Sequence, residues 1–104
     1  MHPLIAEWRV WLAASGKPST TIRLRTNQLL RFAEHQPDLV SATTADMLAW
    51  VGNPRWVAST RKSHRSALTS FYGWAHAFGH VAADQSRKLP AIRVPRRPAR
   101  PAPE

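Results

Sequence analysis

Apolar residues recur at intervals of three and four along most of the chain, the spacing that places them on one face of an α-helix. The first set follows Pro3, which suits the first turn of a helix, and ends before a Ser-Gly-Lys-Pro segment; its members are Leu4, Ile5, Trp8, Trp11 and Leu12. The second set follows Ser19, the expected N-cap, and ends before Pro37; its members are Ile22, Leu29, Phe32 and Ala33. The pattern therefore predicts one helix near the N-terminus and a longer helix after it.

Two further helices are predicted in the second half of the sequence. Thr43 and Asp46 have the spacing of a capping box, and a Gly-Asn-Pro segment ends the short helix that they open. Ser59 or Thr60 is the expected N-cap of the fourth helix, which closes at Gly79. The apolar face of this helix consists of Leu68, Phe71, Tyr72, Ala75 and Phe78.

The remaining sequence sets the fold class and the domain boundary. A weak pattern at 81–89 indicates one more helical turn, whereas sustained strand alternation and Asn-Gly hairpin turns do not occur. We therefore expect an all-α bundle of four or five helices over residues 1–89. Prolines alternate with arginines over 90–104, which is typical of an extended linker leading to a further domain that this sequence lacks.

Charge narrows the class of partner. The chain has 104 residues, enough for one domain, and its 15 Lys and Arg against 6 Asp and Glu give a net charge of +9. A net charge of this size on a small protein creates a positive electrostatic field that attracts polyanions. The guanidinium group of arginine can make two parallel hydrogen bonds to a phosphate or to the edge of a guanine. No apolar run approaches the roughly 18 residues that span a bilayer, and no signal peptide is present, so we expect a cytoplasmic protein without a membrane partner. The lack of cysteine excludes disulfides, thiolate nucleophiles and sulfur-bound zinc.

The starts of the second and fourth predicted helices are basic and rich in hydroxyls. Helix N-termini favour phosphates, and the following turn can reach base edges, so we predict that these segments bind DNA. The candidate residues are Ser19, Thr20, Thr21, Arg23, Leu24, Asn27 and Arg31 on one helix, and Ser59, Thr60, Arg61, Lys62, Ser63 and Arg65 on the other. No acidic residue lies between Met47 and Ala83, so the second segment is not a salt-bridged face. The prediction requires the two cationic starts to lie side by side on one surface.

Several other residues have competing interpretations. Leu24 is apolar away from the core face, where it could contact a thymine methyl, pack on the first helix or simply be exposed. The five tryptophans are expected in the core, with Trp56 as the exception because it lies in a loop. His76 and His80 lack a third ligand, so we expect no metal site and no cofactor. Tyr72, the only tyrosine, lies among apolar positions and is interpreted as structural rather than nucleophilic.

The order of these features resembles the SAM-like core-binding domain of phage integrases, the tyrosine recombinase family. The matching segments are Ser-Thr-Thr-Ile at 19–22, Leu-Leu-Arg-Phe at 29–32, Thr-Ala-Asp-Met at 44–47, the run at 59–75, and Leu-Pro-Ala-Ile-Arg-Val-Pro at 89–95. The sequence departs from the family pattern at Arg25, where many relatives have tyrosine, and at Asp84, which is not followed by proline.

The resemblance implies a four- to five-helix orthogonal bundle that closes with a catalytic domain as a clamp on the double-stranded DNA of the core attachment site. It places Thr21, Arg23, Leu24 and Asn27, together with Ser59, Thr60, Lys62 and Ser63, at the major groove. Arg93, Arg96 and Arg97 of the linker are expected to contact the DNA backbone, and other integrase protomers are expected partners of the whole protein.

The catalytic residues of the family would belong to the absent domain, so this chain is not expected to be an enzyme by itself. No histidine here is followed three residues later by arginine, as the family's His-x-x-Arg motif requires. If Met1 is the native start, no arm-site-binding domain precedes the bundle.

Two other classes of function fit the same charge pattern. One is a dimeric helix-turn-helix regulator that uses the third and fourth helices, which a palindromic preferred site would support. The other is a helical module that binds RNA or an acidic protein, which a comparison of duplex DNA with RNA of matched sequence would separate.

Overall fold

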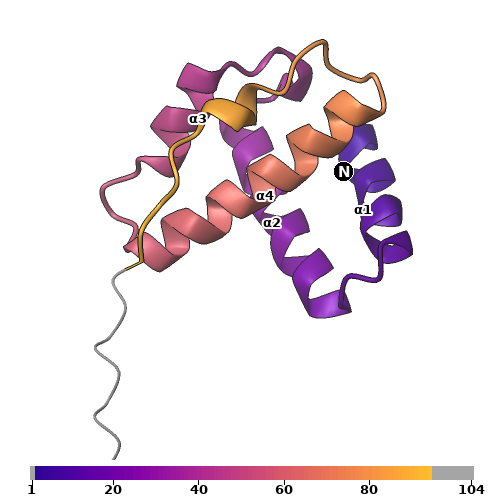
Figure 1. Ribbon diagram of the computed structural model, residues 1–104, viewed down its shortest axis with the longest axis horizontal. Helices are drawn as coiled ribbons and strands as arrows, with labels where there is room; N and C mark the ends of the chain where they lie inside the picture. The colour runs from indigo at the N-terminus through magenta and orange to yellow at the C-terminus, as the bar shows by residue number, and fades with distance from the viewer. Residues whose placement is uncertain (1, 95–104) are drawn as a thin grey trace, which may run out of the picture.

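The computed structural model describes residues 2–94, and the described part of the chain is all-helical (Figure 1). Its α-helices are α1 (Pro3–Ala14), α2 (Ser19–His35), α3 (Thr44–Val51) and α4 (Ala58–Ala77). Two short 3₁₀ helices complete it, η1 (Leu39–Ser41) and η2 (Gln85–Lys88). The predicted all-α bundle is confirmed, and the weak pattern at 81–89 corresponds to the single turn η2.

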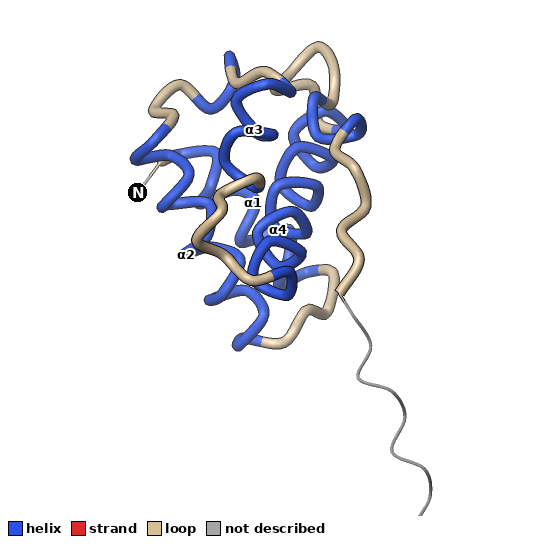
Figure 2. The backbone as a smooth tube through the Cα atoms, turned by 90° about the vertical axis from the view of Figure 1, so that its left-hand side faces the viewer, coloured by secondary structure: helices blue, strands red, loops and turns tan. Residues whose placement is uncertain are grey.

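The two longest helices, α2 and α4, cross in the middle of the molecule, and the other elements surround this crossing (Figures 1 and 2). α1 contacts both α2 and α4, while α3 and η2 contact α4 and each other. Because α4 touches every other helix, its position determines how the remaining elements are arranged.

Apolar side chains from all four helices fill the core around the crossing. The completely buried ones include Ile5, Trp8 and Leu12 of α1, Leu29 and Phe32 of α2, Met47 of α3, and Leu68, Phe71 and Tyr72 of α4. Trp8 and Phe71 meet edge to face with their ring centroids 5.5 Å apart. Burying a side chain of this size contributes about 1.5–3 kcal/mol, so these contacts dominate the stability of the bundle.

Helix α3 begins as the sequence predicts. The Thr43 hydroxyl accepts a hydrogen bond from the backbone N–H of Asp46, and the Asp46 carboxylate accepts one from the backbone N–H of Thr43. This backbone N–H and the Thr43 hydroxyl stabilise the charged carboxylate and so lower the pKa of Asp46. The capping box is therefore confirmed.

The predicted caps of α2 and α4 are wrong by one or more residues. α2 begins at Ser19 with Pro18 as its N-cap, and α4 begins at Ala58 with Val57 as its N-cap. Both caps have extended backbone and neither makes a side-chain cap hydrogen bond. The fixed φ of proline and the β-branched valine favour this entry into a helix, which leaves the hydroxyls of Ser19 and Ser59 free for other contacts.

The end of α4 depends on a glycine. Gly79 has φ +77°, a left-handed conformation that residues with a Cβ rarely adopt. This turn allows the backbone N–H of His80 to donate to the carbonyl of Ala75 at 2.8 Å. The helix therefore closes where the sequence predicted it.

Not every tryptophan lies in the core. Trp8 and Trp74 are buried and Trp50 and Trp56 are half-buried, but Trp11 is 37% exposed. The prediction is thus wrong for Trp11, which lines an open hollow between α1 and the residues at the end of α4, together with the exposed Val10 and Phe78. An apolar residue at helical spacing is buried only when another element covers that side of the helix, and none of the described elements covers Trp11 completely.

Tyr72 supports the segment between α2 and α3. Its hydroxyl donates a buried hydrogen bond to the carbonyl of Leu39 in η1 at 2.8 Å. We predict that Tyr72→Phe lowers the free energy of unfolding by about 1–2 kcal/mol, because the buried carbonyl loses its partner. Urea denaturation followed by circular dichroism measures this. The matched control is Ser15→Ala, which removes an exposed hydroxyl-to-carbonyl bond to Trp11 and should cost under about 0.5 kcal/mol; equal losses in the two variants would contradict the prediction.

Candidate nucleic-acid interface

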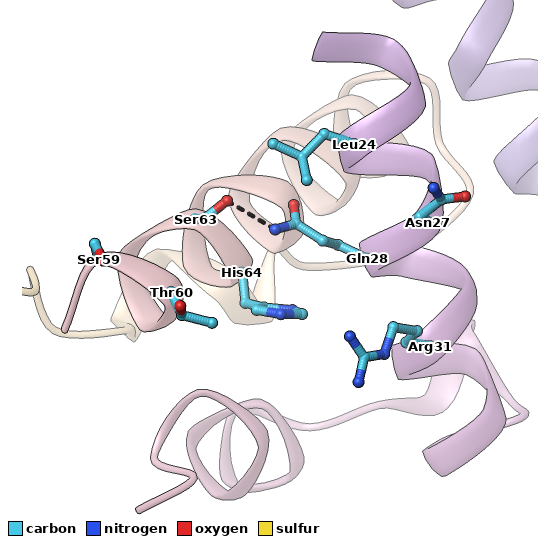
Figure 3. Close-up of a pocket in the computed structure, with 8 residues that line it drawn as sticks. All are labelled: Leu24, Asn27, Gln28, Arg31, Ser59, Thr60, Ser63 and His64. Atoms are coloured by element: carbon cyan, nitrogen blue, oxygen red, sulfur yellow. Dashed lines mark hydrogen bonds between the residues drawn. The ribbon is translucent and has the colours of Figure 1, made fainter. Parts of the chain in front are cut away.

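A groove runs between α2 and the first half of α4 and consists of two adjoining hollows. The first has a volume of about 370 Å³ and is lined by Leu24, Asn27, Gln28, Arg31, Ser59, Thr60, Ser63 and His64 (Figure 3). The second, of about 330 Å³, is lined by Thr21, Leu24, Arg25, Gln28, Ser59, Lys62, Ser63 and Ser66. We call these two hollows together the α2–α4 groove. Because four residues line both hollows, they form one continuous surface.

Hydrogen bonds across the groove define how the two helices cross. The Gln28 Nε2 donates to Ser63 Oγ at 2.7 Å, and one guanidinium nitrogen of Arg25 donates to Ser70 Oγ at 3.4 Å. Later positions on α2 thus face earlier positions on α4, so the helices run in opposite senses. The start of α4 consequently lies beside the middle and second half of α2. The expectation that the two cationic starts lie side by side on one surface therefore holds only in part: Thr21 and Arg25 line the second hollow together with Ser59 and Lys62.

The structure nevertheless brings most of the candidate DNA-binding residues to one surface. Those that line the α2–α4 groove are Thr21, Leu24, Asn27, Arg31, Ser59, Thr60, Lys62 and Ser63. Leu24 is 52% exposed there, so it does not pack into the core. The pairing of the two segments rests on tertiary structure, because 35 positions separate Gln28 from Ser63.

Other candidates lie elsewhere. Ser19 and Arg23 line a separate hollow of about 470 Å³ between α1 and α2, and Thr20 is exposed but lines neither part of the groove. Arg93 is exposed near the end of the described residues, while Arg96, Arg97 and most of the predicted linker at 90–104 lie outside them.

Two arginines of α4 make contacts inside the protein. Arg61 donates through Nε to the backbone carbonyl of Asn53 at 3.2 Å, and Arg65 donates to that of Leu89 at 3.3 Å. These bonds attach the loop before α4 and the segment after η2 to the helix. Both side chains are half-buried, and neither of these two candidate DNA-binding residues lines the α2–α4 groove.

The groove is electropositive. Its walls contribute Arg25, Arg31 and Lys62, and no acidic side chain lines either hollow. The sequence explains this, because no Asp or Glu occurs at 8–33 or at 47–83. Cations beside hydroxyl and amide groups, without carboxylates in the groove to neutralise them, suit an extended polyanion.

Gln28 and His64 belong to the groove but were not among the predicted residues. Gln28 is 7% and His64 is 4% exposed, and both line the first hollow. The Oε1 of Gln28 and the Nδ1 of His64 are buried without a hydrogen-bond partner among the described residues. The sequence does mark His64, which lies in the basic start of α4 and extends its apolar stripe. Nothing local marks Gln28, which is buried because α4 crosses there.

Aromatic rings hold His64 in place. Its imidazole stacks on Trp56 with the centroids 4.1 Å apart and the planes 10° apart, and Trp50 meets it edge-on at 5.8 Å. Burial disfavours the charged imidazolium and lowers the pKa of His64, and the nearby positive charge of Arg31 lowers it further.

The described residues offer little for other chemistry. Tyr72 is buried, and burial together with the charges of Asp46 and Asp38 raises the pKa of its hydroxyl, which makes it a poor nucleophile. Within residues 2–94, no group of three His, Asp or Glu side chains is placed to hold a metal ion. No helix in this range has both the length and the apolar character required to cross a membrane.

The fold is shared with a solved phage protein. The integrase from mycobacterium phage Brujita matches the structure with a TM-score of 0.85 and 22% sequence identity over 97% of this chain. This chain spans 36% of the length of that integrase. No family model matches the sequence, and no curated protein matches it. At this identity the likeness establishes a common fold, which agrees with the fold that the phage-integrase resemblance implied.

The buried His64 predicts a pH dependence of stability. The pKa of His64 in the folded protein lies below the ordinary value of 6.5, because the folded protein favours the neutral imidazole. Its contribution to the free energy of unfolding is therefore fully present above about pH 6.5 and is lost as the pH falls through the folded pKa. We expect the urea midpoint of the wild type to fall more between about pH 7.5 and pH 5 than that of His64→Gln. His76→Gln, at an exposed position of the same helix, is the control and should behave like the wild type; an identical pH response in all three proteins would refute the prediction.

Proposed function

We propose that this chain is the core-site DNA-binding domain of a tyrosine-type site-specific recombinase of the phage integrase family. The observation that carries the proposal is the acid-free α2–α4 groove, which lies on a fold shared with a phage integrase. The groove collects eight of the residues that the sequence selected for DNA binding, although they come from segments far apart in the chain.

The groove residues supply both kinds of contact that DNA recognition needs. Lys62 and Arg31 are exposed and suited to backbone phosphates, which fix position without reading sequence. Asn27 can pair with adenine in the major groove, and the exposed Leu24 can contact a thymine methyl. We infer that phosphate contacts dominate the affinity, so binding weakens steeply as salt rises.

Catalysis would belong to the rest of the parent protein. The only tyrosine of this chain is buried and hydrogen-bonded to Leu39, so it is not the nucleophile of strand exchange. Residues 90–104 would serve as the linker to the catalytic domain, and other protomers and the core attachment site would be the partners of the whole recombinase. It would act in the cytoplasm of a bacterial host.

Replacing Lys62 tests this assignment. We expect Lys62→Ala to weaken binding to duplex DNA several-fold, and to reduce the slope of log K against log salt by about one, because one phosphate contact disappears. Fluorescence anisotropy at several salt concentrations measures both quantities. Lys88→Ala is the matched control, since Lys88 is an exposed lysine of η2 outside the groove.

The outcomes separate the competing functions. Loss of affinity in Lys62→Ala but not in Lys88→Ala, with both variants folded, supports the groove. Equal losses in the two variants would show only nonspecific attraction to a basic protein. Preference for RNA of matched sequence, or binding of the chain as a dimer to a palindrome, would favour the RNA-binding or helix-turn-helix alternative instead.

A further inference from the structure

One end of the α2–α4 groove forms a hollow with a buried histidine in its wall. Figure 3 shows the imidazole of His64 extending from α4 toward the guanidinium of Arg31 on α2, with Thr60 on the same side of α4. The hollow has a volume of about 370 Å³, and all eight residues that line it lack a carboxylate. Its chemistry is that of a site for an anion.

His64 is built into this hollow rather than placed on its surface. It is 4% exposed, and the stacked Trp56 fixes the plane of its ring. Its Nδ1 is buried and has no hydrogen-bond partner among the described residues. A buried polar atom without a partner costs free energy, which a ligand in the hollow could recover.

Two further groups on the walls are available to an oxyanion. No carboxylate of the described residues lies within ion-pair distance of Arg31, and the Thr60 hydroxyl makes no hydrogen bond within residues 2–94. The start of α4, which has no side-chain cap, adds the partial positive charge of a helix N-terminus. The amide oxygen of Gln28, which would repel an anion, points toward Leu24 and away from Arg31 (Figure 3).

We propose that this hollow binds one phosphodiester group of the DNA backbone, held by the Arg31 guanidinium, the Thr60 hydroxyl and the His64 imidazole. The proposal rests on the proposed function and adds to it a chemical identity for the bound group and a role for His64. The side chains of the second hollow, which include Lys62, would then contact the adjoining part of the DNA.

Binding of a phosphate here changes the protonation of His64. In the free protein, burial and the charge of Arg31 both oppose the imidazolium. A phosphodiester anion offsets the charge of Arg31, so His64 takes up a proton from solvent and pairs with the anion. The other groups around the ring are the uncharged Trp50 and Trp56, with His35 on Trp50 at 5.4 Å.

The first experiment measures DNA affinity against pH. The full chain is titrated onto a fluorescent duplex at fixed ionic strength between about pH 7.5 and pH 5.5, with circular dichroism to confirm folding. One linked proton changes affinity by at most about tenfold per pH unit, and we expect the wild type to bind several-fold more tightly at the lower pH. His64→Gln should lose that increase, whereas the control His76→Gln should keep it. Parallel pH profiles for the wild type and His64→Gln would overturn the proposal.

The second experiment uses the wild type alone, so it tests the proposal even if His64→Gln fails to fold. The imidazole NMR signal of His64 is titrated with pH in the free protein, with the duplex and with inorganic phosphate. We expect the duplex to raise the pKa of His64. An unchanged pKa in the DNA complex would overturn the proposal, and a shift with inorganic phosphate but not with the duplex would identify a free-phosphate site instead. If the wild type binds no duplex at any pH, the proposed function fails, while the phosphate titration still tests the hollow.

Discussion

The crossing of α2 over α4 is the constraint on which the rest of the structure depends. Leu29 and Phe32 of α2 and Leu68 and Phe71 of α4 are buried in one apolar core. At the edge of this apolar contact, the amide of Gln28 donates to Ser63 and fixes the register of the two helices. A change in register would separate the walls of the groove. The apolar core and the groove therefore both depend on the same contact between α2 and α4.

The chemistry of the groove follows from where the charges are left free. Arg61 and Arg65 each donate a hydrogen bond to a backbone carbonyl, and these bonds attach the segments before and after α4 to that helix. Lys62, between them in sequence, is exposed and lines the second hollow of the groove. One helix thus uses similar residues for two purposes, and the purpose depends on which side of the helix meets protein and which meets solvent.

The histidine in the groove shows how burial changes the use of a common residue. Trp50 lies in the last turn of the short helix α3, Trp56 lies in the following loop, and His64 lies on the next helix, yet their rings form one cluster. This cluster shields the imidazole from solvent, while the imidazole still lines the first hollow of the groove together with Arg31. A surface histidine would respond mainly to the pH of the solvent, whereas this one responds to the charge of whatever occupies the groove.

The sequence by itself determined the helices, their approximate ends, the excess of positive charge and most of the residues that later line the groove. These features are local, since helical periodicity, the capping box at Thr43 and the stretches without Asp or Glu are all readable from neighbouring positions. Tertiary structure decided the rest: that α2 and α4 run in opposite senses, that Arg23 faces α1 rather than the groove, and that Gln28 and His64 are buried in it. The physical reason is that a helical pattern specifies which side of a helix is apolar, but only packing against another helix decides which polar residues are covered and which partners they meet.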